Sequence, residues 1–168
     1  AIEALRTAIA MGIANAVLLT DGAFKDGDAW ATARVLAGAI KKSGAADVVI
    51  TGKQAVDGNS GLVSVGLSRL LGASYLSGVT KVVDISGGKI TVERGMEEGK
   101  ETVTATLPAV ISVAREINEP RYPSFMGIRK ASKATVPTWA AGDLGLSAGQ
   151  VGKAGSVMEW VDMRKPPA

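Results

Sequence analysis

The first half of the chain alternates between short apolar runs and segments with apolar residues at helical spacing. Residues 1–11 carry one apolar helical face, and residues 16–20 (AVLLT) form an apolar run of strand length. Asp28 is a favoured helix-capping residue, and the apolar spacing behind it predicts a helix to about Lys42. Residues 47–51 (DVVIT) form a second β-branched strand. Strand, helix and strand in this order predict a right-handed parallel crossover.

The second half changes from helical to alternating patterns. Residues 62–71 have helical spacing, whereas residues 79–85, 89–94 and 101–107 alternate and are joined by glycine-bearing turns. An antiparallel meander or hairpin pair follows from that alternation. Residues 109–113 (AVISV) return to the continuous apolar pattern of a buried strand. The predicted fold class is therefore α/β, an open and mostly parallel sheet flanked by helices with an antiparallel hairpin region.

Composition narrows the chemistry that this fold can carry. The 168 residues are 46% hydrophobic, which suits a single core. The chain has no Cys and no His, which excludes Cys/His zinc sites, thiolate iron–sulfur ligation, Cys nucleophiles and imidazole-based triads. Its 19 basic and 16 acidic residues are interspersed, so the net charge of +3 does not form the concentrated patch typical of a nucleic-acid interface.

A polar, glycine-bearing loop follows the second predicted strand. Residues 52–61 (GKQAVDGNSG) lie between that strand and the helix at 62–71, where open α/β sheets bind ligands. Backbone N–H groups and the positive end of a helix dipole at such a place suit a phosphate. The segment has neither the P-loop spacing nor the dinucleotide fingerprint, so an ordinary polar turn remains the alternative.

Two further groups of polar residues are better explained by structural roles than by catalysis or metal binding. Ser86 and Lys89 have the Ser-x-x-Lys spacing of some acyl enzymes, but they flank a predicted tight turn instead of starting a helix. Glu97, Glu98 and Glu101 could form an acid/base or metal-binding group, and a solvated hairpin end is the alternative that we favour.

A basic, proline-bearing stretch leads into the last part of the chain. Residues 115–133 contain five Lys or Arg and two Glu, and the pattern indicates an exposed loop followed by a helix. Phe125 and Met126 interrupt the charges, so they form either an exposed docking anchor or a small inward cluster. Residues from 138 onward are rich in Gly, Ala and Pro with strand-like pieces around Trp139 and Trp160, which predicts an extended C-terminal arm.

Three stretches together resemble the electron transfer flavoprotein beta subunit. They are residues 51–57 (TGKQAVD), residues 92–112 with Arg94, Glu97, Glu98, Gly99, Glu101, Val103 and Pro108 at the family's spacing, and residues 118–131 (NEPRYPSFMGIRKA). The likeness continues to residues 143–146 (DLGL). Family members carry a further N-terminal part, so the expectation is a beta subunit lacking that part.

The resemblance implies an adenine nucleotide alpha hydrolase-like fold that pairs with an alpha subunit. The redox-active FAD is then held mainly by the alpha subunit, and the beta subunit holds AMP or a second FAD. The resemblance gives the nucleotide contacts to a loop made of Gly52, Lys53, Gln54, Ala55, Val56, Asp57, Gly58, Asn59, Ser60, Gly61, Leu62 and Val63. It gives donor docking, with Phe125 as apolar anchor, to Arg121, Tyr122, Pro123, Ser124, Phe125, Met126, Gly127, Ile128 and Arg129.

Two positions depart from the pattern that the family shows. Leu62 stands where a polar residue is usual, while Val63 stands where Thr or Val is frequent, which limits contacts there to backbone groups. Gly95 stands where some members have a Glu that meets the mobile flavin domain. The expected division is an α/β nucleotide-binding domain at 1–137 and an arm at 138–168 that packs on the partner subunit.

The implied function is that of a non-catalytic electron carrier. It would move electrons from flavin dehydrogenases, such as acyl-CoA dehydrogenases, to a membrane quinone oxidoreductase or a ferredoxin-linked partner, in bacterial cytoplasm or the mitochondrial matrix. The alternative is a stand-alone nucleotide-binding signalling module of the same fold. An enzyme is a third possibility, for which the sequence offers no base and nucleophile pair.

Overall fold

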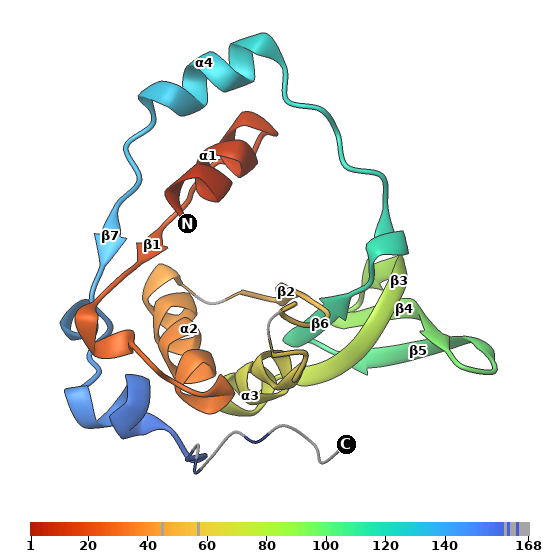
Figure 1. The fold of residues 1–168 in the computed structure, drawn as a ribbon. Helices are drawn as coiled ribbons and strands as arrows, with labels where there is room; N and C mark the ends of the chain where they lie inside the picture. The colour runs from red at the N-terminus through yellow and green to blue at the C-terminus, as the bar shows by residue number, and fades with distance from the viewer. Residues whose placement is uncertain (45, 57, 160, 162–163, 165–168) are drawn as a thin grey trace.

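The computed structural model describes residues 1–44, 46–56, 58–159, 161 and 164 (Figure 1). Its main sheet has five strands in the order β2-β6-β3-β4-β5. Their bounds are Val48–Gly52 for β2, Ser74–Ser86 for β3, Lys89–Met96 for β4, Gly99–Thr106 for β5 and Ala109–Val113 for β6. Strands β2, β6 and β3 pair in parallel, whereas β3, β4 and β5 pair antiparallel. The predicted α/β class and the hairpin region are confirmed.

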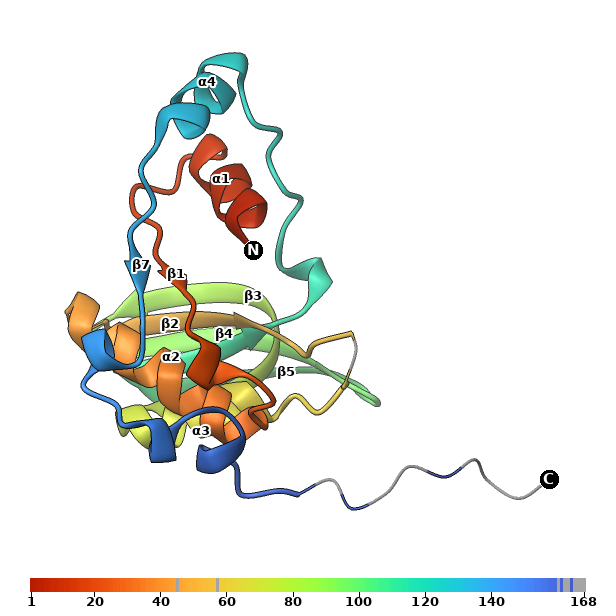
Figure 2. The same cartoon turned by 60° about the vertical axis from the view of Figure 1, so that its left-hand side comes forward.

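Two helices cover one face of this sheet, α2 (Ala29–Ser43) and α3 (Leu62–Leu71) (Figures 1 and 2). Both match the predicted ranges closely. Asp28 caps α2 as expected, because its Oδ1 accepts the Ala31 N–H at 2.8 Å. Ala33 of α2 and Leu67 of α3 are fully buried with Val110 of β6 and form one core between the helices and the sheet.

Strand β3 starts at Ser74, before the predicted position at residue 79. Residues 74–76 pair in parallel with β6, and the strand continues into antiparallel pairing with β4 from Val79. Gly78 stands between the two pairings at a φ of 64°, where the register shifts. The alternation that the sequence shows begins only after this irregularity. A second core of Leu76, Val79, Ile90, Val92, Ala109 and Ile111 lies under the meander.

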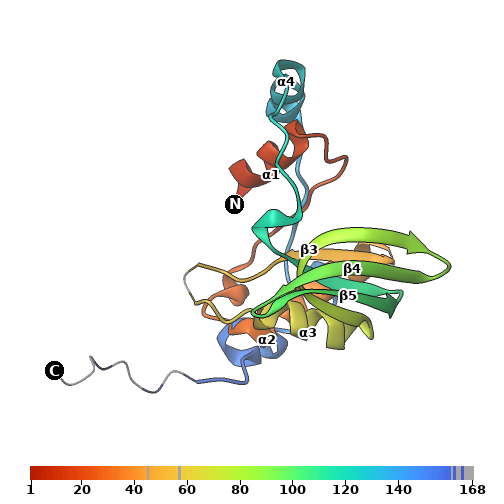
Figure 3. The same ribbon diagram turned by 90° about the vertical axis from the view of Figure 1, so that its right-hand side faces the viewer.

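Helices α1 (Ile2–Ala10) and α4 (Phe125–Lys133) pack against each other and stand away from the main sheet (Figures 2 and 3). The predicted helix at 1–11 and the loop-then-helix at 115–133 are both confirmed. Ile9 is the buried residue of α1, and Ala131 is the buried residue of α4. Residues 11–17 connect α1 to β1, and α4 is connected through 115–124 to β6 and through 134–137 to β7.

The predicted strand at 16–20 forms only in part, and its pairing differs from the expectation. Strand β1 is Leu18–Leu19, and it pairs in parallel with β7 (Thr138–Trp139) as a separate two-stranded sheet. The expected crossover that joins residues 16–20 and 47–51 in one sheet was therefore wrong. One edge of β1 is taken by β7, and an apolar opening lies between its other edge and β2.

The chain after β7 folds back over α2 in short 3-10 turns. Ala141 and Val151 are buried against Val35 of α2. Asp28 holds the following segment, since its Oδ2 accepts the backbone N–H groups of Val157 and Met158 at 2.8 and 3.0 Å. The strand expected around Trp160 falls outside the described residues. Within the described ranges, no helix has the length and apolarity needed to cross a membrane.

Candidate functional site

The candidate nucleotide loop, residues 52–63, leaves the carboxyl end of β2 and enters the amino end of α3. A hydroxyl pair fixes its two ends, because Thr51 Oγ1 and Ser64 Oγ are 2.7 Å apart. Thr51 also donates to the Ile111 carbonyl on β6 at 3.3 Å, which leaves Ser64 as the donor of the pair. Ser64 is only 3% exposed. The start of α3 is thereby tied to the end of the sheet.

Within the loop, the chain folds back on itself. Asn59 donates its backbone N–H to the Ala55 carbonyl at 3.0 Å, and Gln54 Nε2 donates to Asn59 Oδ1 at 3.3 Å. Asn59 and Gly61 both have left-handed backbone, with φ of 49° and 62°, which Asn and Gly accept most readily. The predicted contact residue Asp57 lies outside the described residues.

The residues present fit a phosphate group on backbone donors. Gly61 precedes α3 and supplies no side-chain cap, and Ser60 Oγ meets the Leu62 N–H only at 3.5 Å. A Cβ placed on Gly52 would find no atom within 4 Å, so the backbone is open on that side. The first N–H groups of a helix and the positive end of its dipole favour an anion in such a place.

The side chains of the loop differ in what they can offer. Lys53, Gln54, Asn59 and Ser60 are exposed polar groups. Val56 is 94% exposed and Leu62 48% exposed, and neither carries a polar side-chain atom. Among the described loop residues, side-chain charge and hydrogen bonding therefore come from Lys53, Gln54, Asn59 and Ser60, together with the backbone.

A second group of hydrogen-bonded hydroxyl side chains, which the sequence did not reveal, is centred on the neighbouring strand β6. Ser112, at 2% exposure, accepts hydrogen bonds at 3.3 Å from the Tyr75 hydroxyl and from the Gly78 N–H. Thr51 and Ser112 face each other in the register of β2 and β6. A hydroxyl residue near the end of each apolar run, DVVIT and AVISV, is the signal that could have identified both.

The candidate docking segment, residues 121–129, combines a loop with the first half of α4. Ser124 caps the helix, accepting the Gly127 N–H at 3.0 Å. Tyr122 is 97% exposed, Phe125 81% and Met126 68%. The alternative in which Phe125 and Met126 fold inward is not what the structure has.

Helix α1 supports the docking segment from behind. Gly127 lies against the Ala10 carbonyl so closely that a Cβ would collide with that oxygen. A glycine at this position lets the first turn of α4 sit on the last turn of α1. Arg121, Arg129 and Lys130 are all exposed around the apolar residues. The result is an apolar surface with a basic rim, carried on a helix pair outside the sheet.

Comparison with known proteins places the chain. The family model described as "Electron transfer flavoprotein domain" matches residues 1–144.

The chain belongs to the electron transfer flavoprotein domain family.

Relatives of this family cover nearly the whole chain. An electron transfer flavoprotein subunit beta of Mycobacterium tuberculosis is 42% identical over 154 residues, which are 92% of this chain and 58% of that protein. The Caffeyl-CoA reductase-Etf complex subunit CarD of Acetobacterium woodii is 36% identical over 166 residues, 99% of this chain and 63% of that protein. The resemblance to the beta subunit is confirmed, and the chain spans less than two thirds of the length of these relatives.

The remaining groups of polar residues considered in the sequence lie on hairpin ends. Glu97 and Glu98 are exposed at the β4–β5 turn, and Glu101 Oε2 accepts from Arg94 Nε at 2.6 Å across the two strands. Ser86 and Lys89 face each other across the β3–β4 turn, both exposed. In the described part of the chain, no three acidic residues gather as a metal site.

Proposed function

We propose that this chain acts as the beta-subunit part of a heterodimeric electron transfer flavoprotein. In this role it carries electrons from a flavin dehydrogenase, such as an acyl-CoA dehydrogenase, toward a membrane quinone oxidoreductase or a ferredoxin-linked partner. The family match over residues 1–144 is the observation that carries the proposal. The flavin supplies the redox chemistry when it is bound, and the chain supplies binding and docking without a catalytic residue of its own.

The nucleotide loop holds AMP or a second FAD in this proposal. Support comes from the open backbone at Gly52 and from the amino end of α3, where Gly61 supplies no side-chain cap. The phosphates would rest on backbone N–H groups there, and Lys53 would add positive charge. The tie between Thr51 and Ser64 keeps the loop ends in place before a ligand arrives, which reduces the ordering cost of binding.

The docking segment receives the electron donor. Carriers bind partners transiently through small contacts that combine an apolar anchor with charge complementarity. Phe125 and Met126, exposed inside a basic rim, have those properties and favour an acidic-rimmed apolar hollow on the donor. The redox-active FAD lies mainly in the alpha subunit, and the arm at 138–168 packs on that subunit. Bacterial cytoplasm or mitochondrial matrix is the compartment.

Co-purification with an alpha subunit tests the proposal. The chain is expressed with an alpha subunit of the same source, the pair is purified through a tag on this chain, and visible absorption and released nucleotides are measured. The expected result is a flavin spectrum with a second chain in equal amount, and AMP or FAD in excess over one flavin. A colourless chain that purifies alone would favour the stand-alone nucleotide-binding module.

A further inference from the structure

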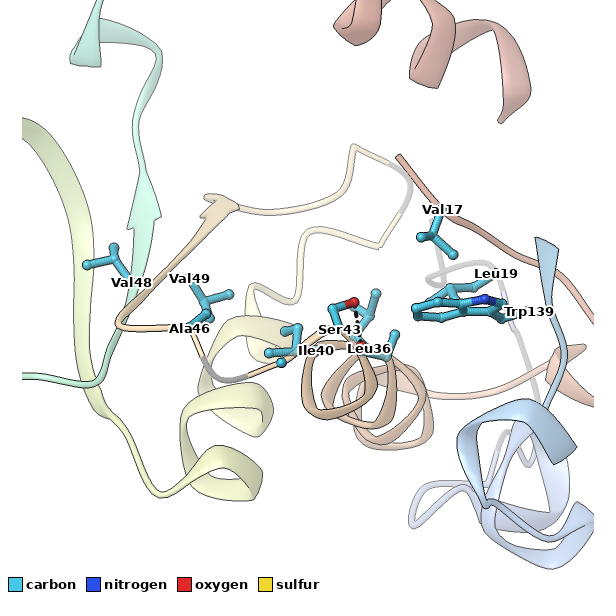
Figure 4. Close-up of a pocket in the computed structure, with 11 residues that line it drawn as sticks. Val17, Leu19, Leu36, Ile40, Ser43, Ala46, Val48, Val49 and Trp139 are labelled. Atoms are coloured by element: carbon cyan, nitrogen blue, oxygen red, sulfur yellow. Dashed lines mark hydrogen bonds between the residues drawn. The ribbon is translucent and has the colours of Figure 1, made fainter. Parts of the chain in front are cut away.

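The described chain has an apolar recess and an apolar projection. The recess lies between β1 and β2 over α2, and Leu36, Ile40 and Trp139 line it together with other uncharged residues (Figure 4). The projection is formed by α4 and by Tyr122, which precedes the helix. Its apolar residues, unlike those of the recess, stand among positive charges. Charge restricts which partner can cover an apolar surface, so the projection is the more informative of the two.

The projection is the outermost part of the molecule. In Figures 1, 2 and 3, α1 lies between α4 and the five-stranded sheet. Gly127 and Ala131, one turn apart, form the inner face of α4, since a Cβ on Gly127 would collide with the Ala10 carbonyl of α1 and Ala131 is buried. The opposite face of α4 therefore points away from the molecule, where a broad, flat partner reaches it without meeting the sheet.

The outer face of α4 begins apolar and continues basic. Phe125 and Met126 occupy the first turn and are exposed. Arg129 and Lys130 follow four residues later on the same side, and Lys133 adds another turn. Exposed aromatic and Met side chains next to Lys and Arg are typical of helices that bind at a lipid–water interface. We name this surface the α4 tip, which consists of Tyr122, Phe125, Met126, Arg129, Lys130 and Lys133.

The positive charge of the α4 tip is not compensated nearby. Residues 120–142 contain no Asp or Glu. Among the described residues, no carboxylate forms an ion pair with Arg129, Lys130 or Lys133. Exposed cations of this kind are attracted to an anionic surface over about a Debye length, roughly 10 Å at 0.1 M salt. A second copy of the chain would place the same cations face to face, so the charge selects an anionic partner.

We propose that the α4 tip binds the surface of an anionic lipid bilayer. Phe125 and Met126 enter the headgroup region, and the three cations remain in water beside the lipid phosphates. Tyr122 suits the boundary, because its ring is apolar and its hydroxyl is polar. This proposal goes beyond docking of an electron donor and does not rest on it. Since both partners would use Phe125 and Met126, a chain bound to the membrane has its donor surface covered.

Sedimentation with lipid vesicles tests the proposal on the 168-residue chain. One set of vesicles contains phosphatidylcholine alone, and the other contains about one third phosphatidylglycerol, which supplies the negative charge. The chain is expected to sediment with the anionic vesicles and to bind the neutral ones at least roughly tenfold more weakly. Raising the salt to about 0.5 M should weaken binding to the anionic vesicles, since it screens the cations.

A fluorescent label shows whether the tip itself enters the bilayer. The chain has no Cys, so Met126→Cys provides a single thiol for an environment-sensitive dye. Anionic vesicles should shift the emission of this label to shorter wavelength, because the dye leaves water. Val83→Cys, at an exposed apolar position of β3, is the matched control and should show no shift.

A pair of charge variants separates the tip from the net charge of the chain. Lys130→Glu should weaken binding to anionic vesicles roughly tenfold. Lys89→Glu makes the same change in net charge at the exposed β3–β4 turn and should leave binding within about twofold of the unmodified chain, because this turn lies away from the tip. Equal losses in the two variants would mean adsorption by net charge alone and would overturn the proposal.

Three further results would overturn it. The first is no sedimentation with anionic vesicles. The second is a shift of the label at position 126 without vesicles as the chain is concentrated, which would assign the tip to a second copy. The third is a shift with an electron donor protein but none with vesicles, which would assign the tip to protein partners alone. Vesicle binding needs neither an alpha subunit nor a nucleotide, so its failure leaves the electron-carrier proposal untouched.

Discussion

The candidate nucleotide loop (residues 52–63) and the candidate docking segment (residues 121–129) are built on opposite principles. The loop lies at the end of the parallel sheet, with both ends tied by Thr51 and Ser64 and with α3 packed on α2 beneath it. The docking segment is carried on a pair of helices outside the sheet, and its apolar side chains face solvent. A phosphate site needs backbone donors in fixed positions, whereas a transient docking surface needs exposed anchors. The difference predicts that mutations will separate stability and nucleotide binding from docking.

The largest effect is expected beneath the nucleotide loop, at Gly66 of α3. A Cβ there would lie 2.8 Å from the Ala33 Cβ and 3.4 Å from the Trp30 ring. Gly66→Leu should lower the free energy of unfolding by about 2–3 kcal/mol, because overpacking outweighs the gain in helix propensity of about 1 kcal/mol. Urea unfolding measures the loss. Val65→Leu, at a 43% exposed position of the same helix, should stay within about 0.5 kcal/mol of the unmodified chain.

The matching glycine of the docking region should behave differently. Gly127→Leu forces α4 away from the Ala10 carbonyl of α1, and neither helix packs on the main sheet. Amide exchange in residues 2–10 and 125–133 should become faster, while exchange in the five-stranded sheet is unchanged. Lys130→Leu, exposed on the same helix, is the control. If amide exchange in the five-stranded sheet also became faster, the helix pair and the sheet would unfold as one cooperative unit, which would contradict the separation of the two regions.

Docking itself should depend on Phe125. In the assembled flavoprotein, Phe125→Ala should raise the donor's KM for the carrier roughly tenfold, as expected when an exposed anchor is removed. Flavin absorbance, nucleotide content and unfolding should not change, since Phe125 contributes little to the core. Val83→Ala, another exposed apolar position, serves as the control. An unaltered KM would refute docking at this segment.

Each region could be predicted from the sequence only as far as the residues that determine it lie close together in the chain. Helix α3 was predicted to the residue because Gly61 and Gly72 bound it, both with left-handed backbone. The pairing of β1 with β7 was not predictable, since two-residue strands separated by more than a hundred residues leave no periodic signal. The start of β3 was not predicted, because the irregularity at Gly78 interrupts the alternation of apolar and polar residues.

The candidate sites divide in the same way. Loop 52–63 could be predicted from its turn residues, and the apolar pair Phe125 and Met126 stood out among charges. The sequence left open whether this pair is exposed or folded inward, and the structure shows it exposed. The hydrogen bond between Thr51 and Ser64 needed the tertiary structure, because it joins the end of a strand to the first turn of a helix across the loop. Local sequence patterns therefore identified the two segments, whereas the contacts that hold them in place became visible only in the tertiary structure.

Removal of that tie should have a smaller effect than overpacking. Thr51→Val keeps the shape but leaves the buried Ser64 hydroxyl without its acceptor, which costs about 1–2 kcal/mol. Nucleotide affinity should fall with stability, since the loop ends are no longer held together. Calorimetric titration with AMP and urea unfolding give the two values. Thr91→Val removes the exposed Thr91–Thr104 pair at 2.9 Å in the hairpin and should alter neither.

The smallest effect concerns acid stability beside the same helices, at Asp28. Burial raises the pKa of this carboxyl, but hydrogen bonds from the Ala31, Val157 and Met158 N–H groups, with a further contribution at Trp30, lower it overall. A pKa that is lower in the folded than in the unfolded chain stabilises the fold above the unfolded pKa of about 4, and this contribution is lost as pH falls through the folded pKa.

Asp28→Asn keeps a capping oxygen for α2, but the amide NH2 that replaces Oδ2 accepts neither the Val157 nor the Met158 N–H group. We expect it to lower the free energy of unfolding at pH 7 by about 1 kcal/mol, with the difference from the unmodified chain shrinking below pH 4. Ser156→Ala removes the hydroxyl that accepts the Asp28 N–H at 2.9 Å and contains no titrating group, so its cost should be the same at both pH values. Urea unfolding at the two pH values measures all three chains. A pH-independent loss for Asp28→Asn would mean that the carboxylate charge does not hold the segment after residue 155 against α2, and that the sheet-side region is less firmly tied than the comparison assumes.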